Sequence, residues 1–214
     1  MLANALRGLA AEFGLTVPKG LHKLEELVAL VSAEASVPAA GRQAMAELYA
    51  QGRAVAERVV TLEGQIARHA RQDATARRLA TIPGVGPITA SLIAATVGDN
   101  IGAFGSARHF AAWLGLVPRQ HSTGGRTRLG RITKAGNAEI RRLLVLGATS
   151  MVWRATRWNS KAGLWVRGVL ARRPVRLVTV ALANKLARIA WALMTRGEVY
   201  QAQGRAPAAA ATVA

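Results

Sequence analysis

The chain has 214 residues, of which 51% are hydrophobic, so it can form one substantial domain or two small ones around an apolar core. It contains no cysteine, which excludes disulfides, thiol nucleophiles and cysteine-ligated zinc. Its four histidines lie without metal-ligand spacing, so we expect no metal site in this chain. The net charge of +18 at pH 7 predicts an anionic partner.

The positive charge lies almost entirely in the second half of the chain. Residues 1–99 carry ten Lys or Arg against nine Asp or Glu, whereas residues 100–214 carry nineteen against two. We therefore expect a scaffold followed by a segment that meets a polyanion. The basic residues do not follow one face of a single helix, which favours nucleic acid over a membrane. The most apolar stretch, 175–194, contains several charged residues, and no signal pattern opens the chain, so we expect a cytoplasmic, nucleoid-associated protein.

Hydrophobic periodicity predicts helices over the first 79 residues. Residues 1–40 are expected to form a helical linker segment, and residues 41–79 a coiled-coil-like long helix. In that long helix apolar residues alternate at three- and four-residue spacing, as in a coiled-coil seam: Met45, Leu48, Val55, Val59, Leu62 and Ile66. The seam fits either one arm of an intramolecular helix pair or an intermolecular coiled coil, and the second interpretation predicts a homo-oligomer, a dimer or tetramer.

Residues 80–200 are expected to form a helical, DNA-binding domain. It opens at 80–98 with the string IPGVGPITA, which is typical of a helix-hairpin-helix whose glycines, Gly84 and Gly86, let backbone amides approach a DNA phosphate. The alternative is a plain connection in which these glycines only permit tight packing. Ser106 and Asn137 are predicted to cap helices. C-terminal helices are predicted over 138–196, the last of them opened by Pro174 and stopped by Gly197, and a disordered tail over 201–214. No run alternates well enough for a sheet, so the predicted fold class is all-α.

A basic Ser/Gly loop, residues 116–137, separates the two halves of that domain. It contains Ser122 and Thr123, the glycines Gly124 and Gly125, and no carboxylate. Positive charge around it comes from Arg119, Arg126, Arg128, Arg131 and Lys134, with Arg141 just beyond. A serine hydroxyl can attack phosphorus only where positive charge stabilises the alkoxide and the transition state, and these arginines supply such charge. From these residues alone, ordinary phosphate binding by a solvated basic face explains the segment better.

Three long segments resemble a known family: 82–99, 104–144 and 172–194, which read IPGVGPITASLIAATVGD, FGSARHFAAWLGLVPRQHSTGGRTRLGRITKAGNAEIRRLL and RRPVRLVTVALANKLARIAWALM. They are similar to the C-terminal half of the DEDD-type insertion-sequence transposases, the bridge-RNA-guided recombinases, in the branch called the eleven-eleven subgroup. The resemblance implies a coiled coil and a helical transposase domain with a serine nucleophile. It also implies a separate RuvC-like domain that binds divalent metal (Mg), a guide RNA and composite active sites shared between subunits.

The resemblance assigns roles to residues of the basic loop. The family's catalytic serine falls on Ser122, with Thr123 as the fallback. Backbone approach and phosphate binding fall on the residues that match the rest of the motif: Gly124, Gly125, Arg128, Gly130, Arg131, Lys134, Gly136 and Asn137. No Asp/Glu cluster in this chain replaces the RuvC-like carboxylates, so we expect it to be inactive alone. The alternatives are a non-catalytic DNA- or RNA-binding remnant and an oligomerisation module built on residues 42–70.

Overall fold

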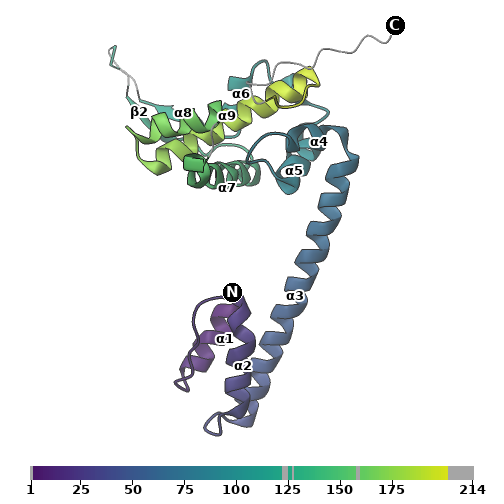
Figure 1. Ribbon diagram of the computed structural model, residues 1–214, viewed down its shortest axis with the longest axis vertical. Coiled ribbons are helices and arrows are strands. Elements are labelled where there is room, and N and C mark those ends of the chain that lie inside the picture. The colour runs from purple at the N-terminus through teal and green to yellow at the C-terminus, as the bar shows by residue number, and fades with distance from the viewer. Residues whose placement is uncertain (1, 122–124, 127, 158–159, 202–214) are drawn as a thin grey trace. The chain divides into compact units, whose positions relative to one another are not determined.

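The computed structural model describes residues 2–121, 125–126, 128–157 and 160–201 (Figure 1). The chain divides into two compact units, Met1–Gln65 and Ile66–Ala214. Helices make up every described element except one small two-stranded sheet, so the predicted all-α class is confirmed.

The first unit consists of short helices packed on the start of a long one. Its elements are α1 (Leu2–Ala11), the 3-10 turn η1 (Leu21–Lys23), α2 (Leu24–Ala33) and the first part of α3 (Ala39–Gln72). Leu6, Leu27, Val31 and Met45 are almost completely buried where these helices meet. The predicted seam of α3 is thus used within the molecule at Met45.

Further along α3 the same seam is open. Val55, Val59 and Leu62 are 56%, 47% and 48% exposed. The long helix also ends earlier than the predicted Leu79. Asp73 takes an extended backbone conformation, and its carboxylate accepts a hydrogen bond from the amide of Ala76 at 2.6 Å. Asp73 is thus the N-cap of a separate helix, α4 (Ala74–Ala80). Its carboxylate satisfies an amide of the first turn of α4, which has no carbonyl partner within that helix.

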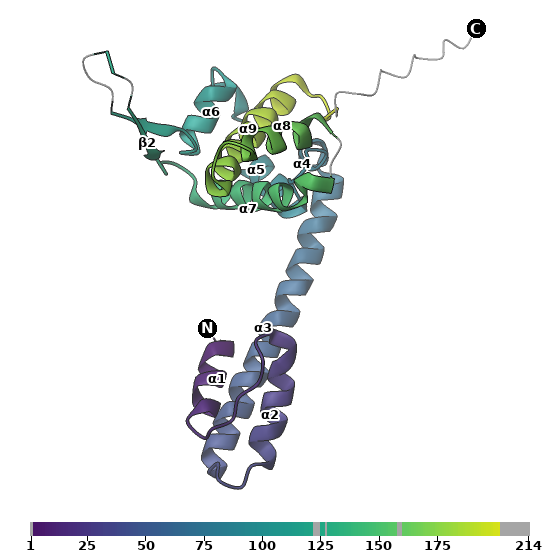
Figure 2. The ribbon, with the colours of Figure 1, turned by 60° about the vertical axis from the view of Figure 1, so that its left-hand side comes forward.

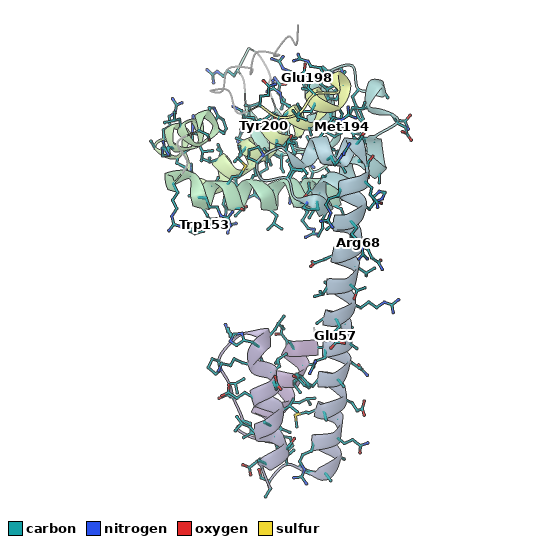
Figure 3. The ribbon with its side chains drawn as sticks, turned by 45° about the vertical axis from the view of Figure 1, so that its right-hand side comes forward. Glu57, Arg68, Trp153, Met194, Glu198 and Tyr200 are labelled. Carbon is teal, nitrogen blue, oxygen red and sulfur yellow. The ribbon has the colours of Figure 1, made fainter. Side chains whose placement is uncertain are left out.

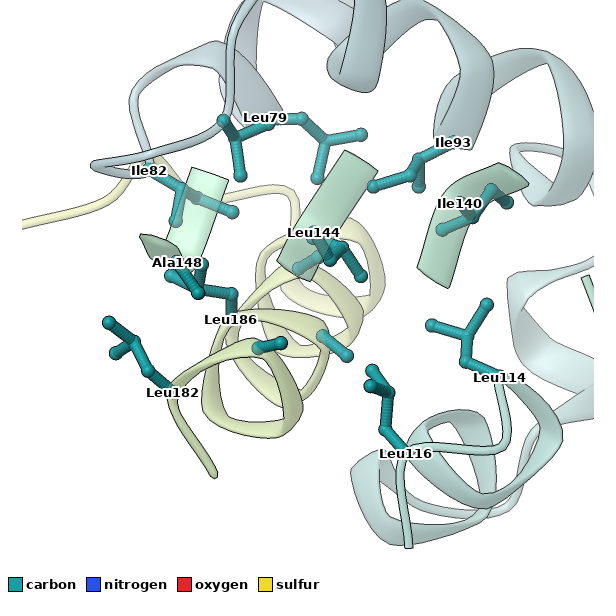
Figure 4. Close-up of a cluster of buried hydrophobic side chains, with 14 of the residues drawn as sticks. Leu79, Ile82, Ile93, Leu114, Leu116, Ile140, Leu144, Ala148, Leu182 and Leu186 are labelled. Atoms are coloured by element: carbon teal, nitrogen blue, oxygen red, sulfur yellow. The ribbon is translucent and has the colours of Figure 1, made fainter. Parts of the chain in front are cut away.

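The second unit is a bundle arranged around its last long helix. After α4 it contains α5 (Pro87–Val97), η2 (Ile101–Ala103), α6 (Ala107–Trp113), α7 (Ala138–Arg154), η3 (Ala155–Arg157), α8 (Lys161–Leu170) and α9 (Val175–Arg196). Helix α9 packs against α4, α6, α7 and α8. Leu79, Ile93, Leu144 and Leu186 come from four of these helices and meet in one core (Figure 4).

Helix α9 is long and apolar enough to cross a membrane by length and composition. Its apolar residues have another use in this fold, however. Val178, Leu182, Leu186 and Leu193 are buried in the core of the second unit. Core helices of soluble proteins pass the same test, so the apolar character of α9 is explained by packing.

Several predicted helix ends are confirmed. The hydroxyl of Ser106 accepts from the amide of His109 at the start of α6, and the Asn137 side chain accepts from the amide of Ile140 at the start of α7. Helix α9 begins after Pro174 and ends at Gly197, which adopts a left-handed φ of 72°. These caps are local chemistry, which explains why the sequence predicts them.

The expectation that no sheet forms is wrong at one place. Strands β1 (Pro118–Gln120) and β2 (Leu129–Ile132) pair antiparallel within the basic loop, with an irregularity between Pro118 and Gln120. Figure 2 shows this hairpin projecting from the helices of the second unit. Almost all of its strand residues are exposed, so the hairpin has no buried face and no alternating pattern to reveal it.

Candidate nucleic-acid interface

The two ends of the basic loop cross at a pair of glycines. Gly115 and Gly136 both take left-handed backbone conformations, with φ of 67° and 66°. A Cβ atom on Gly136 would collide with the carbonyl oxygen of Trp113, and one on Gly115 would collide with the backbone of Ala135. The close backbone approach therefore requires glycine at both positions.

Side chains of two helices fasten the crossing. Arg141 of α7 donates from Nη1 to the carbonyl oxygen of Leu114 at 3.0 Å and to that of Ala135 at 2.7 Å. Asn184 of α9 donates from Nδ2 to the carbonyl oxygen of Leu116 at 3.1 Å. In the sequence Arg141 belongs to the basic residues near the loop. In the structure its guanidinium donates hydrogen bonds to backbone carbonyls and so attaches the hairpin to the bundle.

Beyond the crossing, the hairpin presents cations to solvent. The described cationic residues of the predicted site are all exposed: Arg119, Arg126, Arg128, Arg131 and Lys134. Arg119 also donates from Nη2 to the Thr133 carbonyl oxygen at 3.4 Å. No carboxylate occurs between Trp113 and Asn137 in the sequence, so nothing within the loop neutralises these charges. An arm of this kind suits the phosphates of a nucleic acid.

The predicted nucleophile and its neighbours, Ser122, Thr123 and Gly124, lie outside the described residues. The segment on each side of them is described. The amide of His121 donates to the carbonyl oxygen of Arg128 at 2.8 Å, which extends the pairing of the hairpin toward its tip. Gly125 follows with a left-handed φ of 76° and open space around it.

A hollow lies beside the strands of the hairpin. It is lined by His121, Arg128, Leu129 and Gly130. The His121 ring lies against Gly130, where an added Cβ would come within 3.3 Å of it. The predicted site does not include His121, although its place directly before Ser122 is a signal for it in the sequence.

The second predicted contact region is the turn between α4 and α5. Gly84 has a left-handed φ of 82° and packs against α7, where an added Cβ would lie 2.7 Å from the Met151 sulfur. A Cβ on Gly147 would collide with the Gly84 carbonyl oxygen, so the two backbones are in close contact. The packing interpretation thus accounts for Gly84. Gly86 has open space around it, and its contact with DNA stays a prediction.

Gly86 lines a pocket of about 300 Å³ that also contains residues absent from the sequence-based site. Gly84, Val85 and Gly86 form one side, and Ser150, Met151 and Arg154 of α7 form the other. More than sixty positions separate Arg154 from the turn, so no local pattern could connect them.

The hairpin and this turn lie toward opposite ends of α7. The hairpin joins α7 at Asn137, and the turn meets it at Gly147 and Met151. At 1.5 Å per residue, the two contact points are roughly 15–20 Å apart along the helix. Asn137, which we predicted to contact DNA, caps α7 with its side-chain oxygen, which accepts a hydrogen bond from the Ile140 amide at 3.0 Å. Among the residues that the structure describes, no three His, Asp or Glu side chains are grouped so as to hold a metal ion.

Comparison with known proteins places these features in context. Residues 76–163, which include the α4–α5 turn, the hairpin and α7, match the model of the "Transposase IS116/IS110/IS902 family". Three curated relatives align with nearly the whole chain. They are "Putative transposase y4pF/y4sB" of Sinorhizobium fredii (46% identity, 96% of this chain, 53% of the relative), "Probable family 20 transposase" of Pseudomonas aeruginosa (44%, 94%, 60%) and "Transposase for insertion sequence element IS1328" of Yersinia enterocolitica (40%, 92%, 58%).

The chain spans between 53% and 60% of the length of these relatives. The family match covers the predicted site, and the relatives cover the rest of the chain. Over residues 76–163 the chain is therefore similar to the IS116/IS110/IS902 transposase family, and over nearly its whole length it is similar to proteins named as transposases.

Proposed function

We propose that this chain is the DNA-binding, serine-bearing part of an insertion-sequence transposase and acts in DNA transposition. One observation carries the proposal: exposed cations of a hairpin flank residues 122–123 in the chain, and the hairpin is hydrogen-bonded to α7 at its base. The similarity to transposases, including one of an insertion sequence, supports the same function.

The proposed chemistry places Ser122 as the nucleophile, with Thr123 as the fallback. Its Oγ releases its proton to water and forms a bond to a DNA phosphorus while the bond from that phosphorus to one deoxyribose oxygen breaks, and the released oxygen takes up a proton from water. Negative charge develops on the non-bridging oxygens, and arginines of the hairpin such as Arg128 and Arg131 stabilise it. Glycines beside the serine allow the DNA backbone to come close.

Other components of the reaction are proposed from the family resemblance alone. A RuvC-like domain would supply the carboxylates and the divalent metal, and a guide RNA would select the DNA. The open part of the α3 seam at Val55, Val59 and Leu62 supports a homo-oligomer through a coiled coil. We expect the assembly to act on DNA in the bacterial cytoplasm.

Covalent capture tests the proposal. The chain, supplied with the RuvC-like domain of a relative, is incubated with a nicked suicide DNA substrate and run on a denaturing gel. We expect a protein–DNA adduct that Ser122→Ala abolishes and that Thr123→Ala retains. Loss with Thr123→Ala alone would move the role to the fallback residue. An adduct that survives both substitutions would overturn the nucleophile, and DNA binding without any adduct would favour a binding protein.

A further inference from the structure

Trp153 has an unusual position for a tryptophan in this fold. It is 78% exposed, the highest value among the described large hydrophobic side chains (Figure 3). The remaining described tryptophans, Trp113, Trp165 and Trp191, pack against the core of the second unit. Because its indole is left largely in water, Trp153 contributes little to the core, and a binding role explains its exposure better.

The helix face around Trp153 continues this surface. Leu146, Ser150 and Trp153 follow one another at four- and three-residue spacing, so they lie on one face of α7. Leu146 is 59% exposed, and Ser150 is also exposed. This face therefore offers an apolar platform with a hydroxyl at its centre.

The platform adjoins the pocket beside the α4–α5 turn. Ser150 and Arg154 are one helical turn apart and both line that pocket, opposite Gly86. Ser150 thus belongs to both surfaces, and Trp153 is next to Arg154 in the chain. Ser150 therefore lies about one helical turn from both an exposed indole and a cation, at the C-terminal end of α7.

Charge identifies the kind of partner that fits this surface. Residues 138–172 contain seven Lys or Arg and only one acidic residue, Glu139. The Glu139 carboxylate pairs with Arg142 at 2.9 Å, two turns or more from Trp153. Arg154 and Arg157, one and four residues after Trp153, are exposed, and the ion pairs found within the described part of the chain include neither of them. The partner should therefore carry negative charge and a planar apolar group.

We propose that this face of α7 binds an unpaired nucleotide of a single-stranded nucleic acid. The base stacks on Trp153, and an adjacent phosphate enters the pocket beside Arg154. In a duplex the faces of the bases are covered by their neighbours, so an exposed indole can stack only on a base outside a helix. This site is separate from the basic hairpin, and the proposal goes beyond the serine chemistry proposed above.

Equilibrium binding of the full chain tests the proposal. Short fluorescent single-stranded DNA, single-stranded RNA and duplex DNA of equal length are titrated at one salt concentration, and anisotropy is recorded. Trp153→Ala is expected to weaken binding of single strands by about 5- to 100-fold, as for other base-stacking aromatics, and Trp153→Phe to retain most of it. Comparison of the DNA and RNA arms shows which strand the site prefers.

The matched control is Leu164→Ala, which removes another exposed apolar side chain, on α8. It should leave all three affinities unchanged. Arg131→Ala in the hairpin should weaken duplex binding, so failure of the hairpin and failure of the Trp153 site give different results. Photocrosslinking of oligonucleotides that contain 5-bromouracil should map to Trp153 in the unsubstituted protein.

Three results would overturn the proposal. One is an unchanged single-strand affinity in Trp153→Ala. The second is an equal loss for duplex and single strands, which would make Trp153 a structural residue. The third is a loss of self-association or of binding to anionic vesicles in Trp153→Ala while its single-strand binding persists, which would assign the surface to a second protein copy or a membrane.

Discussion

The guanidinium of Arg141 donates to the carbonyl oxygen of Ala135 at 2.7 Å and, with the same nitrogen, to that of Leu114 at 3.0 Å. These two carbonyls belong to opposite ends of the basic hairpin. One side chain of α7 therefore holds both ends of the segment that carries the predicted nucleophile. The base of the hairpin is thereby attached to the bundle, whereas its described strands, Pro118–Gln120 and Leu129–Ile132, are almost entirely exposed.

Arg141→Ala should destabilise the second unit and loosen the hairpin. Hydrogen bonds from a charged donor contribute about 1.5–3 kcal/mol, and partial exposure of this site places the expected loss in free energy of unfolding at about 1–2 kcal/mol. Urea denaturation measures it. Arg141→Lys keeps the charge but loses the planar guanidinium, so it should recover only part of the loss. A fully stable Arg141→Ala protein whose only defect is a weaker salt dependence of DNA binding would make Arg141 a phosphate ligand instead.

Binding of duplex DNA should weaken steeply as salt rises. Each phosphate contact made by a cation contributes about 0.9 to the slope of log affinity against log salt. Arg131→Ala and Arg128→Ala should each make that slope shallower by about one contact, measured by anisotropy over a salt series. Arg53→Ala is the matched control, because Arg53 lies on α3 and pairs with Glu57 at 3.2 Å. Salt-independent binding, or an equal effect of Arg53→Ala, would contradict the hairpin interface.

Gly147→Ala should destabilise the second unit more than the addition of a single methyl group suggests. An added methyl group would collide with the Gly84 carbonyl oxygen, so either the turn or α7 must shift, at a cost of about 1–3 kcal/mol. Gly168→Ala on α8 is the control, since nothing lies within 4 Å of its position. There alanine should stabilise the helix by up to about 1 kcal/mol. Thermal unfolding that ranks the two variants the other way would show that the Gly84–Gly147 contact is absent in solution.

The open seam of α3 should mediate self-association. Val59→Glu places a charge among Val55, Val59 and Leu62 and is expected to shift a dimer toward monomer in sedimentation velocity. Val60→Glu is the matched control, because Val60 is 68% exposed and lies off the seam. If the unsubstituted chain is monomeric at high concentration, or if both variants dissociate equally, the coiled-coil interpretation is wrong.

Local signals made much of the fold predictable. The helix starts at Ser106 and Asn137 and the stop at Gly197 depend on a few neighbouring residues, and all three appear in the structure. The break at Asp73 was missed although the same chemistry causes it, because the apolar spacing around it continues into α4. The continuing apolar spacing therefore predicts one long helix, whereas in the structure the Asp73 cap ends α3 and begins α4.

The site was less predictable where it depends on distant contacts. The composition of the loop predicts its positive charge. Its two strands were not predicted, because they have no buried face and so no alternation of apolar and polar residues. The anchoring role of Arg141 requires Leu114 and Ala135 to meet, which only the Gly115–Gly136 crossing brings about. Likewise, Arg154 joins Gly86 in one pocket through the packing of α7, not through the chain.

In the proposed reaction Ser122 becomes covalently joined to DNA. The direct measurement is mass spectrometry of the peptide that remains attached to nucleotide after the captured complex is digested with protease and nuclease. We expect the added nucleotide mass to map to Ser122, and Arg131→Ala to lower the yield without moving the site. A nucleotide mapped to a residue outside positions 122–123, or an equal yield from Ser122→Ala, would contradict it.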